Sequence, residues 1–266
     1  MYVRLKHALS ALALRAIAAP RRSVHRAAVA WLAAFCHLAA GRSERGLPAE
    51  RRFVVPLGDV AEAARRLGAG RGRRALEPLV EAGILQRRGD ALALASGFEP
   101  HFPYMARQVH RAAGVISGLG ARRRPRGIPP VVWKGAVLFN GGLFFECHEF
   151  LEDAWRAAPP EEKPFYHGII LVAAGFYHLE KGNLHGARTK LAAGINTLRA
   201  PPAASYGIRL DRWLPSLARW QARLDAGAGT GVLEVSEIPR IPFDRPGTRR
   251  RERPWATTCR GSSTSR

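Results

Sequence analysis

The stretch FNGGLFFECHEFLEDAWR, residues 139–156, gathers side chains that could carry out chemistry. His148, Glu149 and Glu152 lie close together in it, and an imidazole beside two carboxylates can transfer protons or bind a divalent metal ion. Residues four apart lie on the same side of a helix, so Glu152 can reach His148 one turn before it and Arg156 one turn after it. The segment therefore holds either an active or metal-binding site or an internal network of paired charges.

Helical geometry bears on this choice. Placed on one continuous helix, residues 139–156 separate into an apolar face and a polar face. The polar face carries the three candidate residues and Arg156, but also Phe145 and Trp155. Large aromatic side chains gain free energy by burial, so we expect neighbouring helices to cover part of this face. We interpret the set mainly as an interhelical polar network, the candidate polar cluster: His148, Glu149, Glu152, Trp155 and Arg156.

A catalytic or metal-binding role is the alternative. HEFLE is not the zinc-protease motif HExxH, because residue 152 is Glu. No second Glu-x-x-His follows, as a di-iron bundle would require, and no nucleophile or cofactor motif accompanies the cluster. We therefore predict no cofactor and assign no metal ligands. An enzyme that uses His148, Glu149 and Glu152 for acid–base chemistry, or to hold a divalent metal ion, stays open.

Further helices must position this segment. Residues 163–181 are apolar nearly all round, which is typical of a central, buried helix. Tyr166, His167 and His178 on that helix are further side chains that could reach the cluster. Asn183 is expected to cap a third helix, and a fourth runs to about residue 224. We predict a helical bundle over residues 130–225.

The pair of segments LFNGGLFFECHEFLEDAWR and FYHGIILVAAGFYHLEKGNLHGARTKL resembles the family known as domain of unknown function 309, an all-helical bundle of bacteria and plastids. The resemblance covers about residues 132–200. It implies a compact helical bundle and supplies no established reaction. Gln is usual in the family at the position of His167, so the resemblance favours His148 as a site residue. The residues that carry it are Phe139, Asn140, Gly142, His148, Glu149, Glu152, Trp155, Gly168, Gly182, Asn183, Gly186 and Ala187.

Residues 23–97 show the order helix, turn, helix, hairpin, which is typical of a winged helix-turn-helix. Gly83 is expected to end the second helix, and ILQRR and ALALA flank a Gly-Asp turn. Arginines at the start of the recognition helix and on the wing suit contact with phosphates, and we predict DNA or RNA contact through Arg71, Arg73, Arg74, Arg87 and Arg88. A winged helix that binds protein is the alternative.

The charge distribution agrees with that prediction. The formal net charge of the 266 residues is +21. Residues 1–129 hold 23 Lys and Arg against 8 Asp and Glu (+15), residues 130–225 hold 11 against 9 (+2), and residues 226–266 hold 8 against 4 (+4). Such asymmetry favours an anionic partner for the N-terminal half, although a genome that prefers Arg would produce it too.

The expected organisation is a mainly α protein in which a small winged helix-turn-helix-like domain precedes a C-terminal helical bundle. We expect a basic, poorly ordered leader over residues 1–22, a connecting helix and basic Pro/Gly linker over residues 98–129, and a disordered basic tail over residues 226–266. The three cysteines are far apart in the sequence, which argues against a disulfide framework or a zinc cluster.

The predicted location is the cytoplasm, with a cleaved N-terminal leader for export or an organelle as the alternative. No transmembrane segment is predicted, because the apolar run over residues 27–40 is too short. These observations favour an accessory or regulatory protein: a non-catalytic recognition bundle joined to a basic, nucleic-acid-binding winged-helix region. The bundle would bind a protein or a small ligand.

Overall fold

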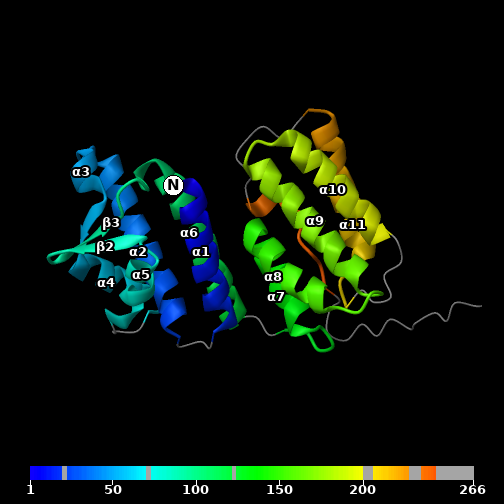
Figure 1. Cartoon of the computed structure of the whole chain (residues 1–266), viewed down its shortest axis with the longest axis horizontal. Coiled ribbons are helices and arrows are strands. Elements are labelled where there is room, and N and C mark those ends of the chain that lie inside the picture. Colours follow the sequence, from blue (N-terminus) through cyan, green and yellow to red (C-terminus); the bar gives the residue numbers. More distant parts are fainter. Residues whose placement is uncertain (20–22, 70–72, 122–123, 200–205, 228–234, 244–266) are drawn as a thin grey trace, which may run out of the picture.

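The computed structural model describes residues 1–19, 23–69, 73–121, 124–199, 206–227 and 235–243. The protein is mainly α-helical with one small sheet, so the predicted fold class is confirmed. Figure 1 shows the N-terminal helices and the sheet grouped together, in blue to cyan, beside a bundle of green to yellow helices. The candidate polar cluster lies in that bundle.

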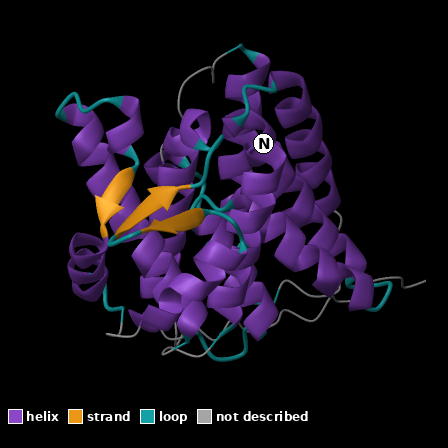
Figure 2. Cartoon of the chain, turned by 60° about the vertical axis from the view of Figure 1, so that its left-hand side comes forward, coloured by secondary structure: helices purple, strands orange, loops and turns teal. Residues whose placement is uncertain are grey.

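The sheet and its flanking helices fit a winged-helix-like unit. The sheet is antiparallel with strand order β1-β3-β2, and all three strands lie together at one side of the helices (Figure 2). The hairpin between β2 and β3 turns at Gly89, whose φ of +58° suits glycine, and it corresponds to the predicted wing. The elements in chain order are α2 (Val24–Glu44), α3 (Ala49–Arg52), β1 (Val54–Pro56), α4 (Leu57–Arg66), η1 (Arg73–Leu76), α5 (Glu77–Glu81), β2 (Leu85–Arg88) and β3 (Ala91–Leu94).

The prediction of a poorly ordered leader is wrong for residues 2–18. They form α1 (Tyr2–Ala18), because Leu5, Leu9, Leu12 and Ala16 make a stripe that is buried against the rest of the unit. Residues 20–22 of the predicted leader lie outside the described residues.

The helix expected to connect the two halves packs against the N-terminal ones. After η2 (Glu99–His101), α6 (Phe102–Ala121) contacts both α1 and α2 and buries Met105, Val109 and Ala112. It therefore forms part of the N-terminal unit, which is larger than residues 23–97.

α2 is the central helix of this unit. It is long and apolar enough, by length and composition, to cross a membrane over Val24–Arg42, and 56% of that window is buried in the protein. A core helix and a signal sequence pass the same test, so the test by itself assigns no membrane span. Here the apolar side chains contact α1, α4 and α6, as expected of a core helix.

The bundle contains a helix boundary that differs from the prediction. A single helix through residues 139–156 is wrong, because Gly141 and Gly142 end α7 (Pro130–Asn140) before α8 (Phe144–Ala157) begins. Gly142 has a φ of +73°, and the amide of Leu143 donates to the carbonyl of Leu138. The bundle is completed by α9 (Lys163–Glu180), α10 (Leu184–Arg199) and α11 (Leu210–Asp225).

The GNLHGA turn between α9 and α10 explains several residues of the family-like motif. As predicted, Asn183 caps α10, and its Oδ1 accepts from the amide of Gly186 at 2.9 Å. A Cβ at Gly186 would lie 2.8 Å from Nδ1 of His178, so a larger residue would displace that imidazole. The turn therefore places His178 as well as joining two helices.

The prediction of a disordered tail is wrong for residues 235–243, which begin with η3 (Val235–Glu237) and cross the bundle. The indole N–H groups of Trp213 and Trp220 donate to the carbonyls of Pro239 (2.7 Å) and Glu237 (3.1 Å). The Asn140 side chain accepts from the amide of Ile241 and donates to its carbonyl. These contacts satisfy backbone groups that would otherwise need water. Residues 228–234 and 244–266 lie outside the described residues.

Candidate functional site

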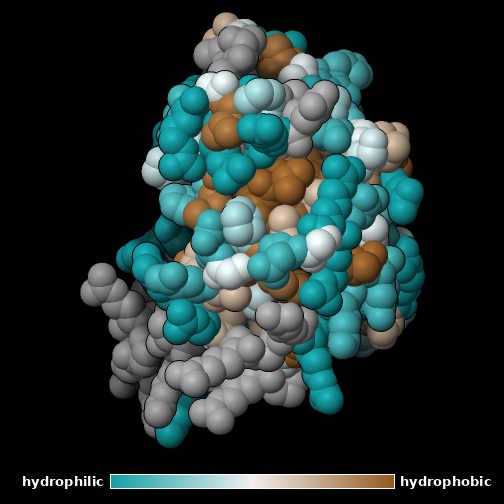
Figure 3. All heavy atoms as spheres, turned by 90° about the vertical axis from the view of Figure 1, so that its left-hand side faces the viewer, coloured by the Kyte–Doolittle hydropathy of each residue, from teal (hydrophilic) through white to brown (hydrophobic). Residues whose placement is uncertain are grey.

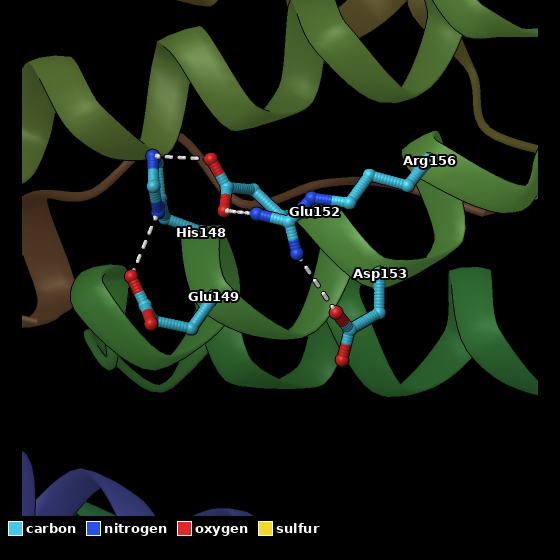
Figure 4. Close-up of polar contacts among 5 residues, drawn as sticks. All are labelled: His148, Glu149, Glu152, Asp153 and Arg156. Carbon is cyan, nitrogen blue, oxygen red and sulfur yellow. Dashed lines mark hydrogen bonds and ion pairs between the residues drawn. The ribbon is translucent and has the colours of Figure 1, made fainter.

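Four residues of the candidate polar cluster, with Asp153, form a chain of close polar contacts along α8 (Figure 4). Nδ1 of His148 lies 3.3 Å from Oε1 of Glu149, and Nε2 lies 3.7 Å from Oε1 of Glu152. Arg156 donates to Oε2 of Glu152 at 2.7 Å and to Asp153 at 3.1 Å. These polar contacts run within one helix, whereas the sequence analysis expected a network between helices.

The arrangement of these donors is poor for a metal ion. The two carboxylates lie at opposite nitrogens of the His148 ring, so they cannot converge with one imidazole nitrogen on a shared ion. Within the part of the chain that the structure describes, no group of three or more His, Cys, Asp or Glu side chains is arranged to hold a metal ion.

A groove of about 350 Å³ opens beside the cluster, between α8 and α9. It brings residues of the cluster together with His167 and His178, the two α9 histidines considered from the sequence. Glu149 and Arg156 are not among its lining residues. The groove is lined by Phe145, His148, Glu152, Trp155, His167, Ile170, Leu171, Ala174, Tyr177, His178 and Lys190.

The aromatic residues on the polar side of α8 are partly covered, as the sequence analysis expected. Trp155 stacks on His167 with ring centroids 5.7 Å apart. Phe145 lies against Tyr177 at 5.5 Å, and Nζ of Lys6, on α1, lies 3.9 Å from the centre of the Phe145 ring. One side of the groove is therefore shared with the contact between α1 and the bundle.

Tyr166 does not reach the groove. It is buried on another side of α9, beside Phe165 and Tyr206. A second cavity, of about 710 Å³, lies between α6, α7 and residues 240–243 and is lined partly by Trp133. No residue of the candidate polar cluster lines this second cavity.

Neither described cysteine is placed to act as a nucleophile. Cys36 and Cys147 are fully buried, and burial raises the pKa of both thiols. Sγ of Cys147 donates to the carbonyl of Gly135 at 3.3 Å. Cys147 therefore packs α8 against α7 and stays protonated.

Sequence reasoning missed the buried charges where the N-terminal unit meets the bundle. Glu146 of α8 is only 3% exposed, and burial raises its pKa to about 7. Arg111 of α6 forms a buried ion pair with Glu180 of α9 and donates to the carbonyl of Gly142 at 3.0 Å. Its positive charge acts to lower the pKa of Glu146, while the charge of Glu180 acts to raise it.

Aromatic residues surround these charges. Nζ of Lys181 lies 4.1 Å from the ring centre of Tyr104 and 4.4 Å from that of Tyr2. Burial is the main cause that raises the pKa of Tyr104 and of Tyr177. The junction between the two parts of the protein thus combines buried charges with aromatic rings and the ammonium groups of Lys6 and Lys181.

The predicted nucleic-acid residues are partly described. Arg74 is exposed on η1, which leads into α5, the helix predicted to be the recognition helix, and Arg87 and Arg88 are exposed on β2, in the predicted wing. Arg73 begins η1, and Arg71 lies outside the described residues. The side of the molecule that carries this unit is largely hydrophilic, with hydrophobic side chains gathered across its middle (Figure 3).

The comparisons with known proteins concern the bundle. Residues 132–189 match the model of a family described as a domain of unknown function (DUF309), so the resemblance predicted from the sequence is confirmed there. Uncharacterized protein YpuF of Bacillus subtilis (strain 168) is 38% identical to this chain over 69 residues. The match covers 26% of this chain and 40% of that protein, less than half the length of either.

Proposed function

We propose that this chain is an accessory or regulatory protein that acts by recognition rather than by catalysis. Its winged-helix-like unit contacts nucleic acid, and its bundle binds a partner molecule. The observation that carries the proposal is the basic wing: Arg87 and Arg88 are exposed on β2, and exposed Arg74 opens the recognition helix. Arginine at these places is suited to phosphate oxygens.

The recognition helix limits what kind of contact this is. Its exposed positions after Arg74 are Glu77, Val80 and Glu81, and two carboxylates would be repelled by phosphates in a groove. Contact led by the wing avoids this repulsion. We therefore infer binding to the nucleic-acid backbone with little dependence on base sequence.

The bundle's part in this proposal is non-catalytic recognition. Glu152 is held by Arg156, and Glu149, whose side chain is 40% exposed, lies outside the groove. The groove beside them offers aromatic walls and an apolar base, which suit binding. An acid–base enzyme, the alternative, has less support because its carboxylates are already paired or turned away from the groove.

The test is the salt dependence of binding to a 20-base-pair DNA duplex, measured by fluorescence anisotropy for the wild type and for Arg74→Ala/Arg87→Ala/Arg88→Ala. The binding constant falls as the salt concentration rises, and each lost phosphate contact makes the slope of log K against log[salt] shallower by about 0.9. We expect the triple variant to bind more weakly and to have a slope about 3 units shallower if all three arginines contact phosphates.

The matched control is Arg126→Ala/Arg199→Ala/Arg212→Ala, which removes three exposed arginines outside the winged-helix-like unit. It should leave most of the affinity and slope unchanged. Equal losses in the two variants would mean diffuse attraction by net charge, and a wild type that binds no duplex would remove the nucleic-acid part of the proposal.

A further inference from the structure

The groove between α8 and α9 has two chemically different ends. The helices run in opposite directions, because Phe145 contacts Tyr177 while Trp155 contacts His167. His167 and His178 are eleven residues apart on α9, so the groove extends about 16 Å along the helix. The Trp155 end is aromatic and flat. The other end brings together His148, His178 and Lys190.

The charge at the second end is not balanced within the groove. Lys190 of α10 lies close enough to His178 that burial and this ammonium group lower the pKa of the imidazole. No salt bridge joins Lys190 to a carboxylate among the described residues. Glu152 is the one acidic side chain among the lining residues, and Arg156 already neutralises it. The groove is therefore net positive near His178.

His148 adds an unsatisfied polar atom. Its Nδ1 is buried and makes no hydrogen bond, since its contact with Glu149 at 3.3 Å has unsuitable geometry. Nδ1 faces Glu149, which lies outside the groove, so the ring presents its opposite side, with Nε2, toward Glu152 and the groove. The middle of the groove is apolar, because Ile170, Leu171 and Ala174 form it.

We propose that this groove binds a small organic anion with a flat, apolar body, such as an aromatic carboxylate or phosphate ester. The anionic group lies between Lys190 and His178, and the body lies along Ile170, Leu171 and Ala174 toward Trp155. A volume of about 350 Å³ is at the lower end of that of small-molecule sites. This inference names the partner of the bundle and so rests on the proposed recognition function.

The test uses calorimetric titration of the full chain with 1-naphthoate, with 1-naphthylmethanol as its neutral counterpart and with inorganic phosphate as an anion without an apolar body. We expect 1-naphthoate to bind more tightly than either comparison compound. Lys190→Gln should weaken 1-naphthoate binding about tenfold or more, because it removes one charge-assisted contact. Since Lys190 is exposed, the variant should fold normally.

Lys134→Gln, on α7 outside the groove, is the matched control and should leave the affinity unchanged. Equal binding of 1-naphthoate and 1-naphthylmethanol would overturn the anionic part of the proposal, as would equal losses in the two lysine variants. No binding of any compound would overturn the site itself. None of these results would alter the wing experiment, so the two proposals can fail separately.

Discussion

Replacing Arg111 with methionine is expected to destabilise the protein by roughly 3–5 kcal/mol, because the change breaks a buried ion pair by removing one partner. The side chains of Arg111 and Glu180 are 8% and 7% exposed, so the ion pair is largely shielded from water. The carbonyl of Gly142 would lose its donor, and the nearby Glu146 would lose its stabilising positive charge. Urea unfolding at pH 7, followed by circular dichroism, measures the effect.

Two further variants separate this cause from a general effect of losing an arginine. Arg15→Met removes an exposed arginine from α1 and should change the free energy of unfolding by less than about 0.5 kcal/mol. Adding Glu180→Gln to Arg111→Met should recover part of the loss, since it removes the unpaired charge. If the double variant is no more stable than Arg111→Met, the unpaired carboxylate is not the source of the destabilisation.

Replacing Glu146 with glutamine is expected to change how stability depends on pH. Burial, the largest cause, raises the pKa of this carboxyl from 4.5 to about 7 in the folded protein. The folded state therefore binds a proton that the unfolded state has already lost, and the contribution of Glu146 to stability falls as the pH rises from about 4.5 to about 7. A shift of this size corresponds to up to roughly 3 kcal/mol.

The comparison is between the free energies of unfolding of wild type and Glu146→Gln at pH 4.5 and pH 8. Glutamine has nearly the same shape as glutamate and cannot ionise. The free energy of unfolding of Glu146→Gln, relative to that of the wild type, should be higher at pH 8 than at pH 4.5. The reason is that only the wild type must bury a carboxylate at pH 8. Glu149→Gln is the control, since that side chain is 40% exposed. A constant difference between wild type and Glu146→Gln would mean that Glu146 does not titrate in this range.

Local sequence signals predicted much of the fold. α9 was placed within one residue of its observed end, because an all-round apolar segment stops at Lys181 and Gly182. The order of a helix and then a hairpin follows from Gly83 and the Gly-Asp turn, which break the chain where the structure has its turns. Both signals are local and depend little on what packs against the segment.

The elements that the sequence analysis missed depend on distant partners. The sequence of α1 alone is typical of a basic leader. It forms a helix of the unit because α2 and α6 provide the surface against which Leu5, Leu9 and Leu12 are buried. Residues 235–243 have no helical or strand pattern, and they are held by two indole groups and the Asn140 side chain. Gly141 and Gly142 are a local signal for the break between α7 and α8. The apolar pattern continues on both sides of them, which is why the sequence predicts one helix there.

The candidate site was predicted in part. The sequence places His148, Glu152 and Trp155 on one side of α8, with Tyr166, His167 and His178 as side chains that could reach them. The two histidines line the groove with these residues, and Tyr166 does not. Glu146 was missed because a glutamate on a helix is usually solvated. It lies at the edge of the apolar stripe, beside Leu143, which is a signal of burial, but Arg111 is too far along the chain to be recognised as its neighbour.

We propose the groove between α8 and α9 as the recognition site of the bundle. The most direct measurement is the ¹⁵N–¹H spectrum of the full chain during titration with 1-naphthoate, with the tryptophan indole signals assigned through Trp155→Phe and Trp133→Phe. Trp155 lines the groove and Trp133 lines the larger cavity beside α6, so each signal reports on one place. We predict that the Trp155 signal shifts with saturation while the Trp133 signal stays fixed. A shift of Trp133 alone, or no indole shift at all, would contradict the claim.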